Sequence, residues 1–205
     1  MKRIVLAAAL IGAVGTATVH AQQPATPVDE TVQRAVHVCN ACHGEGGRST
    51  QAAYPRLAGQ LPQYTVAQLK AFRDQKRSEL DTQAYMWGVS ALLDDATIQG
   101  LADYYAAQAP APGTPLPAAR SAVGRKIFEM GIPARGVRPC ASCHGDRGEG
   151  ASVFPRLAGQ HASYVLRQLN QFGTRLRPHA VLMKNETAQM TAAEKRAVAE
   201  YVQSL

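Results

Sequence analysis

Cys39-Asn40-Ala41-Cys42-His43 in the first half of the sequence is answered by Cys140-Ala141-Ser142-Cys143-His144 in the second half. The chain has 4 cysteines, and all of them lie in these two Cys-x-x-Cys-His motifs. The spacing is typical of covalent haem attachment, in which two thiols bond to one edge of the macrocycle and the adjacent histidine reaches the iron. The sequence therefore predicts two haem c groups, attached through Cys39, Cys42, Cys140 and Cys143, with iron bound by His43 and His144.

Three other interpretations of the cysteine pairs explain less. A zinc site would draw on both pairs at once, yet the pairs lie a whole repeat apart and each is followed by histidine. A thioredoxin-like dithiol needs a βαβ pattern, which the sequence lacks. A disulfide within either pair would close a small loop and do little to stabilise a fold.

The two motifs belong to a longer internal repeat. Residues 54–60 read Tyr-Pro-Arg-Leu-Ala-Gly-Gln, and residues 154–160 read Phe-Pro-Arg-Leu-Ala-Gly-Gln. Further matched pairs follow in the same order: Tyr64 and Tyr164, Gln68 and Gln168, Leu69 and Leu169, Phe72 and Phe172, Met86 and Met183, and Tyr104 and Tyr201. This many ordered matches indicate a duplicated domain.

Helical spacing of apolar residues in both copies predicts an all-α fold, and Thr191 with Glu194 predicts a capping box at the start of the final helix. The proline-rich residues 110–117 predict an extended linker between packed domains. We expect an N-terminal domain at 22–109 and a C-terminal domain at 118–205. Domains this small bury a modest apolar core, and aromatic residues make up only 6% of the chain, so a bound macrocycle is expected to complete each core.

Met86 and Met183 are the candidates for the second iron ligand. Each lies seven residues before the hydrophobic residue that opens the final helix of its copy, Leu93 or Met190. A lone methionine usually fills a core, but the matched position in both copies favours ligation, and a thioether ligand suits electron transfer. His179 is an alternative ligand in the second copy, although its position has no counterpart in the first. His37 and His161 are interpreted as surface residues.

These motifs resemble those of the dihaem cytochrome c4 family over nearly all of the chain beyond residue 21. The resemblance implies two tandem class I cytochrome c domains, each wrapped round a covalent haem, with the haems facing each other across a pseudo-twofold interface. It also implies that the carbonyls of Pro55 and Pro155 accept hydrogen bonds from the haem histidines. Haem propionates would be stabilised by Arg56, Arg156, Tyr64 and Tyr164. The chain departs from the family pattern around Met86 and Met183.

The first 21 residues predict a secretory signal, with Lys2 and Arg3 followed by an apolar stretch from 4 to 14 and small residues around a cleavage point after Ala21. An uncleaved membrane anchor is the alternative, but the apolar stretch is shorter than the ~20 residues that span a bilayer. We therefore expect a soluble protein exported to the periplasm.

The formal charge of +7 is unevenly distributed. Residues 22–110 hold 7 basic and 9 acidic residues, whereas residues 111–205 hold 13 basic and 6 acidic residues. A basic C-terminal domain predicts docking to an acidic redox partner, with weak membrane-surface contact as a secondary role. Nucleic acid is an unsuitable partner because no reading motif is present.

The leading functional hypothesis is a dihaem electron carrier between a respiratory donor, such as a quinol-oxidising complex or a periplasmic dehydrogenase, and a terminal oxidase or another acceptor. The alternatives are a cytochrome subunit of a periplasmic dehydrogenase or flavocytochrome, and a dihaem enzyme. The last would need an open or unusual iron ligand, for which no spare cysteine exists.

Overall fold

The computed structural model of the chain describes residues 29–80 and 82–205, so the predicted signal segment lies outside the described residues. Within these ranges the regular structure is helical, apart from isolated bridges between Ile132 and Val137 and between Ala151 and Phe154. The N-terminal copy contains α1 (Glu30–His43), η1 (Glu45–Gly47), α2 (Pro62–Arg73), η2 (Thr82–Met86), α3 (Trp87–Ser90) and α4 (Asp95–Ala106). The C-terminal copy contains α5 (Ala118–Met130), η3 (Pro133–Arg135), α6 (Ala141–His144), α7 (Ala162–Gln171), α8 (Val181–Thr187) and α9 (Ala192–Ser204).

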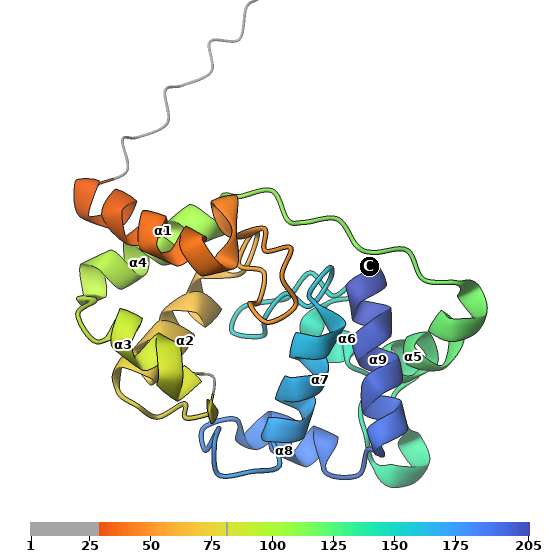
Figure 1. Ribbon diagram of the computed structural model, residues 1–205. Coiled ribbons are helices and arrows are strands. Elements are labelled where there is room, and N and C mark those ends of the chain that lie inside the picture. The colour runs from red at the N-terminus through yellow and green to blue at the C-terminus, as the bar shows by residue number, and fades with distance from the viewer. Residues whose placement is uncertain (1–28, 81) are drawn as a thin grey trace, which may run out of the picture.

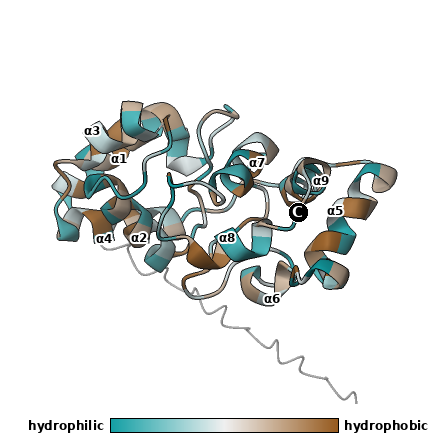
Figure 2. Cartoon of the chain, turned by 90° about the horizontal axis from the view of Figure 1, so that it is seen from below, coloured by the Kyte–Doolittle hydropathy of each residue, from teal (hydrophilic) through white to brown (hydrophobic). Residues whose placement is uncertain are grey.

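The helices form two groups that match the two copies of the repeat: α1–α4 lie on one side of the molecule and α5–α9 on the other (Figure 1). Hydrophobic and hydrophilic stretches alternate along the helices of both groups (Figure 2). Each group buries its apolar stripes in its own core, since α1 and α2 pack against α4 while α5 and α7 pack against α9. The N-terminal core centres on Val32, Leu101 and Tyr105, and the larger C-terminal core on Phe128, Val198 and Val202.

The first and last helices of each copy cross at a glycine. In the N-terminal copy, a Cβ atom added to Gly100 on α4 would come within 2.4 Å of the Val32 side chain on α1. In the C-terminal copy, a Cβ on Gly124 of α5 would come within 2.1 Å of the Ala197 carbonyl on α9. Each crossing therefore needs one residue without a side chain. In the N-terminal copy this glycine lies on the last helix, and in the C-terminal copy it lies on the first helix.

The C-terminal copy carries an additional segment between its first helix and its cysteine motif. In the N-terminal copy α1 runs directly through the motif to His43, whereas α5 ends at Met130 and the motif restarts as the separate helix α6. Residues 131–139 fill this gap. Arg138 in this segment forms an ion pair with Glu186 on α8, with 2.6 Å between Nη2 and Oε1.

The linker between the two groups has an extended backbone without helix, and it touches both copies. The carbonyl of Pro112 accepts a hydrogen bond from the Arg56 guanidinium at 3.4 Å, and the Thr114 amide donates to the Gln203 carbonyl at 2.9 Å. Pro110 packs so closely on Gly59 that a Cβ there would lie 2.4 Å from the proline ring. The linker is thus part of the contact between the copies.

The predicted capping box at the start of α9 is present, with Thr191 and Glu194 bonded reciprocally. Glu194 also pairs with Arg135 from the additional segment. The hydrogen bond from Arg135, followed by that from the Thr191 amide, lowers the pKa of Glu194 from 4.5 to about 2. A carboxylate with a lower pKa in the folded state stabilises the protein above its unfolded-state pKa, and this stabilisation is lost as the pH falls through the range 4.5 to 2.

Glu194→Gln is expected to reduce the free energy of unfolding by about 1–2 kcal/mol at pH 7, because the neutral amide loses the ion pair with Arg135 and accepts more weakly from the Thr191 amide. The difference from the wild type should shrink as the pH falls toward 3, as measured by guanidinium unfolding at several pH values. Glu30→Gln, which alters an exposed i,i+4 pair with Arg34, is the control and should change stability by less than about 0.5 kcal/mol. A pH-independent loss in Glu194→Gln would contradict the prediction.

Candidate haem sites

Each cysteine motif lies on one short stretch of helix. Cys39, Cys42 and His43 occupy the last turns of α1, and the second motif follows the same geometry on α6 with Cys140 as its N-cap. Residues three and four apart share a helix face, so the two sulfur atoms and the imidazole of each motif project to the same side. That is the donor set a covalently attached haem requires.

Both motif histidines are buried and anchored by a backbone carbonyl. Nδ1 of His43 lies 2.8 Å from the Pro55 carbonyl oxygen, and Nδ1 of His144 lies 2.9 Å from that of Pro155. Because a carbonyl can only accept, Nδ1 carries the proton and Nε2 is left with a free lone pair for a metal. Burial lowers the pKa of both imidazoles, which favours the neutral form that binds iron.

The Pro-Arg-Leu-Ala-Gly-Gln blocks are fixed to the rest of each copy by matching backbone bonds. The Leu57 amide donates to the Gly47 carbonyl at 2.8 Å, as the Leu157 amide donates to Gly148 at 2.7 Å. Gly47 has φ +75, and a Cβ at this position would lie 2.8 Å from the Tyr105 ring, so no other residue fits. Gly47 and Gly148, each four residues after its motif histidine, thus help to position the proline carbonyl that the histidine contacts.

Met86 and Met183 lie in corresponding segments, both half-buried. Four residues after each methionine a buried hydroxyl bonds back to the methionine carbonyl: Ser90 to Met86 at 2.5 Å and Thr187 to Met183 at 2.8 Å. The Met86 segment is also attached through Trp87, whose indole donates to the Arg77 carbonyl at 2.8 Å. Both methionines are therefore held through their backbone carbonyls, and Met183 also packs against the C-terminal core.

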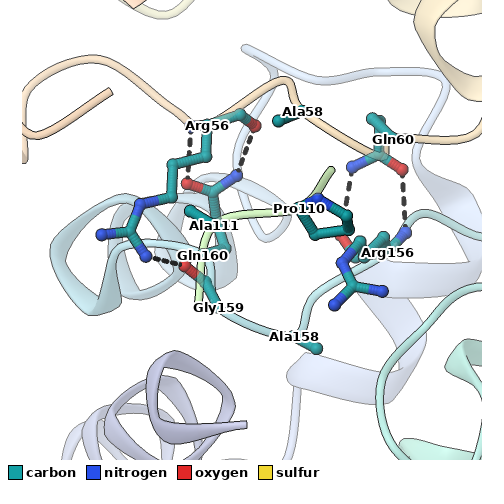
Figure 3. A pocket seen from close by; sticks show the side chains of 9 residues that line it. All are labelled: Arg56, Ala58, Gln60, Pro110, Ala111, Arg156, Ala158, Gly159 and Gln160. Atoms are coloured by element: carbon teal, nitrogen blue, oxygen red, sulfur yellow. Dashed lines mark hydrogen bonds between the residues drawn. The ribbon is translucent and has the colours of Figure 1, made fainter. Parts of the chain in front are cut away.

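Two glutamines join the copies through reciprocal hydrogen bonds, as Figure 3 shows. Gln160 accepts from the Arg56 amide and donates to the Arg56 carbonyl, both at 2.9 Å. Gln60 makes the same pair with Arg156, at 2.8 and 3.1 Å. A cavity of about 10 Å³ lies between the bridges, lined in part by Pro110 and Ala111 of the linker. These bonds give the interface its pseudo-twofold symmetry.

A cluster of charged side chains is also buried between the copies. Arg77 donates to Gln68 at 2.9 Å and to Gln168 at 3.0 Å, and Arg177 donates to the same two oxygens at 3.0 and 2.7 Å. Glu79 pairs with Arg77 at 3.0 Å and is 3% exposed. Two guanidinium groups and one carboxylate leave this buried cluster with an excess positive charge. Such a cluster favours a nearby anionic group.

The two arginines expected to contact haem propionates differ in their surroundings. Arg56 directs its guanidinium to carbonyl oxygens, with Nε 3.2 Å from Ser49 and Nη1 bonded to Gly159. Arg156 has a buried Nε for which residues 29–80 and 82–205 offer no hydrogen-bond acceptor. Buried donors are almost always satisfied, so this atom fits a site where a haem carboxylate supplies the acceptor. The hydroxyl oxygen of Tyr164 accepts a hydrogen bond from Arg77 Nη2 at 3.2 Å.

The structure corrects one prediction about histidines. His37 and His179 are exposed, but His161 is only 6% exposed, with Nε2 3.0 Å from the Ser49 carbonyl of the other copy. His161 is the N-cap of α7, and the N-terminal copy covers its side chain. Burial, followed by the charge of Arg56, lowers the pKa of His161. The prediction of a surface residue was therefore wrong.

Comparison with known proteins agrees with this geometry. A family model described as cytochrome c matches residues 121–205. Cytochrome c4 of Thiocapsa roseopersicina is 37% identical over 173 residues, which cover 82% of this chain and 87% of that protein. The chain belongs to the cytochrome c4 family. A solved cytochrome c4 structure from Acidithiobacillus ferrooxidans superposes with a TM-score of 0.74 at 38% identity, covering 82% of this chain and 98% of that one.

Membership of the cytochrome c4 family establishes several of the predictions. The fold consists of two helical cytochrome c domains, and the chain is an electron carrier rather than an enzyme, with two covalent haem c groups. A further relative, named thiosulfate dehydrogenase electron acceptor in Thiomonas intermedia, is 37% identical over 171 residues, covering 80% of this chain and 76% of that protein. In the part of the chain that the structure describes, no helix has the length and apolar character needed to cross a membrane.

Sequence reasoning missed Arg77 and Arg177, which carry the buried cluster of this cytochrome c4. A signal was present, because each arginine follows a matched phenylalanine by five residues, and each guanidinium stacks on that ring at 4.6 Å from its centroid. It also missed the hydroxyls of Ser90 and Thr187, which stand four residues after the two methionines. Continuing the repeat comparison past the motifs would have found both pairs.

Glu79→Gln is expected to reduce the free energy of unfolding by about 3–5 kcal/mol, because it removes the buried carboxylate that faces the guanidinium groups of Arg77 and Arg177. Guanidinium unfolding of the holoprotein measures this. Asp95→Asn is the control: its exposed pairs with Lys70 and Arg73 should be worth less than about 1 kcal/mol. Equal losses in the two variants would refute a special role for the buried cluster.

Proposed function

We propose that each haem iron is bound by one histidine and one methionine of its own domain: His43 with Met86, and His144 with Met183. The observation that carries this proposal is the matched environment of the four side chains. In both domains the histidine Nδ1 is engaged by a proline carbonyl, and the methionine carbonyl is engaged by a buried hydroxyl. Because the histidine and the methionine have the same surroundings in both domains, we assign them the same role as iron ligands in both.

The haem supplies an iron atom that cycles between its ferrous and ferric forms. The protein determines how readily it does so. A thioether ligand opposite a histidine raises the reduction potential, while the proline carbonyls orient the imidazoles and strengthen their donation. Arg156 and Tyr164, with Arg56 and Tyr64, stabilise the propionates in this proposal, which is supported by the unsatisfied Nε of Arg156 and by the positive charge of the Arg77 cluster.

Ferric haem with methionine ligation has a weak absorption band at long wavelength. Met86→Ala and Met183→Ala are each expected to remove about half of this band and to lower the midpoint potential of one haem, because that iron loses a thioether ligand that favours its ferrous form. Met130→Ala, at an exposed position of α5, is the control and should change neither property. An unchanged band in Met183→Ala, together with an altered spectrum of one haem in His179→Ala, would show that the histidine is the ligand.

The cellular setting follows from the N-terminal residues and the relatives. Residues 1–21 are proposed to export the chain to the periplasm, where domains 22–109 and 118–205, joined by 110–117, carry electrons from a respiratory donor to a terminal oxidase. The relative named as a thiosulfate dehydrogenase electron acceptor supports a second donor class, a periplasmic dehydrogenase with which this chain would act as a cytochrome partner.

The proposed docking face for an acidic partner lies around α8 in the C-terminal domain. Val181 and Leu182 are 61% and 49% exposed there, beside exposed Lys184 and preceded by exposed Arg175. An apolar patch with a basic rim suits brief contact with an acidic surface, since the charges steer the approach and the apolar centre holds the encounter. In the N-terminal domain, exposed Leu92 is instead followed by the acidic pair Asp94 and Asp95.

Lys184→Glu is expected to slow oxidation of the reduced protein by membranes of the source organism about three- to tenfold at low ionic strength, with the difference vanishing at high salt. Stopped-flow spectroscopy measures the rate. Lys126→Glu makes the same charge change on α5, away from α8, and serves as the control. If both variants slow the reaction equally, net charge rather than this face governs docking.

A further inference from the structure

One peptide group in each domain takes part in both the haem site and the domain interface. The carbonyl oxygen of Pro55 and the amide N–H of Arg56 belong to the same peptide bond. The oxygen accepts from His43 Nδ1 at 2.8 Å, and the N–H donates to Gln160 Oε1 of the other domain at 2.9 Å. A continuous line of hydrogen bonds therefore runs from a motif histidine to a side chain across the interface.

The second domain repeats the arrangement in the opposite direction. Nδ1 of His144 lies 2.9 Å from the Pro155 oxygen, and the N–H of the same peptide, that of Arg156, lies 2.8 Å from Gln60 Oε1. Each glutamine oxygen also accepts from the amide that follows it, Leu61 or His161, at 3.0 Å. The glutamines are buried and their amide orientation is set by the donors on both sides, so the acceptor stays in place.

Hydrogen bonds that share a peptide group strengthen each other. An acceptor at the N–H pushes electron density through the amide toward the carbonyl oxygen, which then attracts the histidine proton more strongly. A stronger bond at Nδ1–H makes the imidazole a better electron donor through Nε2. A better donor stabilises ferric iron and lowers the reduction potential.

We propose that Gln160 tunes the N-terminal haem through Pro55 and His43, and that Gln60 tunes the C-terminal haem through Pro155 and His144. Each domain thereby sets part of the reduction potential of the other. Both glutamines are positioning residues, since they act through a peptide group and touch neither iron nor haem in this scheme. The inference rests on the proposed ligation by His43 and His144.

The test uses the holoprotein with midpoint potentials resolved for each haem by NMR, following haem methyl resonances assigned to their domains. Gln160→Leu is expected to raise the midpoint of the N-terminal haem by about 30 mV, a roughly threefold change in its reduction equilibrium, because the Arg56 N–H loses its acceptor. Gln60→Leu should raise the midpoint of the C-terminal haem instead. Gln108→Leu, which removes a bond within one domain, is the control and should move neither.

Two further measurements separate tuning from loss of domain contact. The Ser78 amide donates to the Leu176 carbonyl across the interface at 2.9 Å without involving either glutamine, so its protection from hydrogen exchange reports docking. Gln160→Glu keeps an acceptor oxygen for the Arg56 amide, and it should leave the N-terminal midpoint at or below that of the wild type. The charge of the carboxylate also lowers this midpoint, so the decisive outcome is a rise in Gln160→Glu like that in Gln160→Leu, which would show that the acceptor does not matter.

Several outcomes would overturn the inference. They are an equal shift of both haems in each leucine variant, a shift only in the haem of the mutated domain, or a rise in both Gln160→Leu and Gln160→Glu. Failure of the underlying ligation has a separate signature: the wild-type ferric protein would lack paramagnetically shifted imidazole resonances of His43 and His144. If those resonances are present and the crosswise pattern is absent, the ligation stands and the tuning is wrong.

Discussion

The hydrogen bond between each motif histidine and a proline carbonyl is the contact on which the rest of the molecule depends. It fixes the Pro-Arg-Leu-Ala-Gly-Gln block against the cysteine motif. The same block then supplies the arginine backbone and the glutamine that join the domains. Because the block cannot move without disturbing the histidine, the geometry of the haem site and that of the interface are determined together.

Much of this organisation could be predicted from the sequence, because it repeats within the chain. The helices, the capping box at Thr191 and the cofactor all follow from local spacing. The burial of His161 and the crossing of Arg77 and Arg177 onto shared glutamines could not. Those features depend on which surface the other domain presents, and a duplicated sequence specifies two similar domains without specifying how they meet.

The duplication preserves the paired polar contacts at the centre of the interface, although His161 and Glu79 have no counterpart in the other copy. The glutamine bridges and the stacked arginines have counterparts in both halves. Larger differences lie at the periphery, where the C-terminal copy holds residues 131–139 and where the charges of the two halves diverge. A buried polar contact tolerates little change, because each lost partner leaves a desolvated group, whereas an exposed edge can change to suit a partner.

The two methionine segments are held by different neighbours, and this bears on how separable the halves are. The segment around Met183 is anchored inside its own domain, where Glu186 pairs with Arg138 beside the cysteine motif. The segment around Met86 depends on Trp87 bonding to Arg77, whose guanidinium is held by glutamines of both domains. The Met183 segment thus has an anchor of its own domain beside the cysteine motif, whereas the Met86 segment is attached to an arginine that the two domains share, so separating the domains would disturb the surroundings of Met86 first.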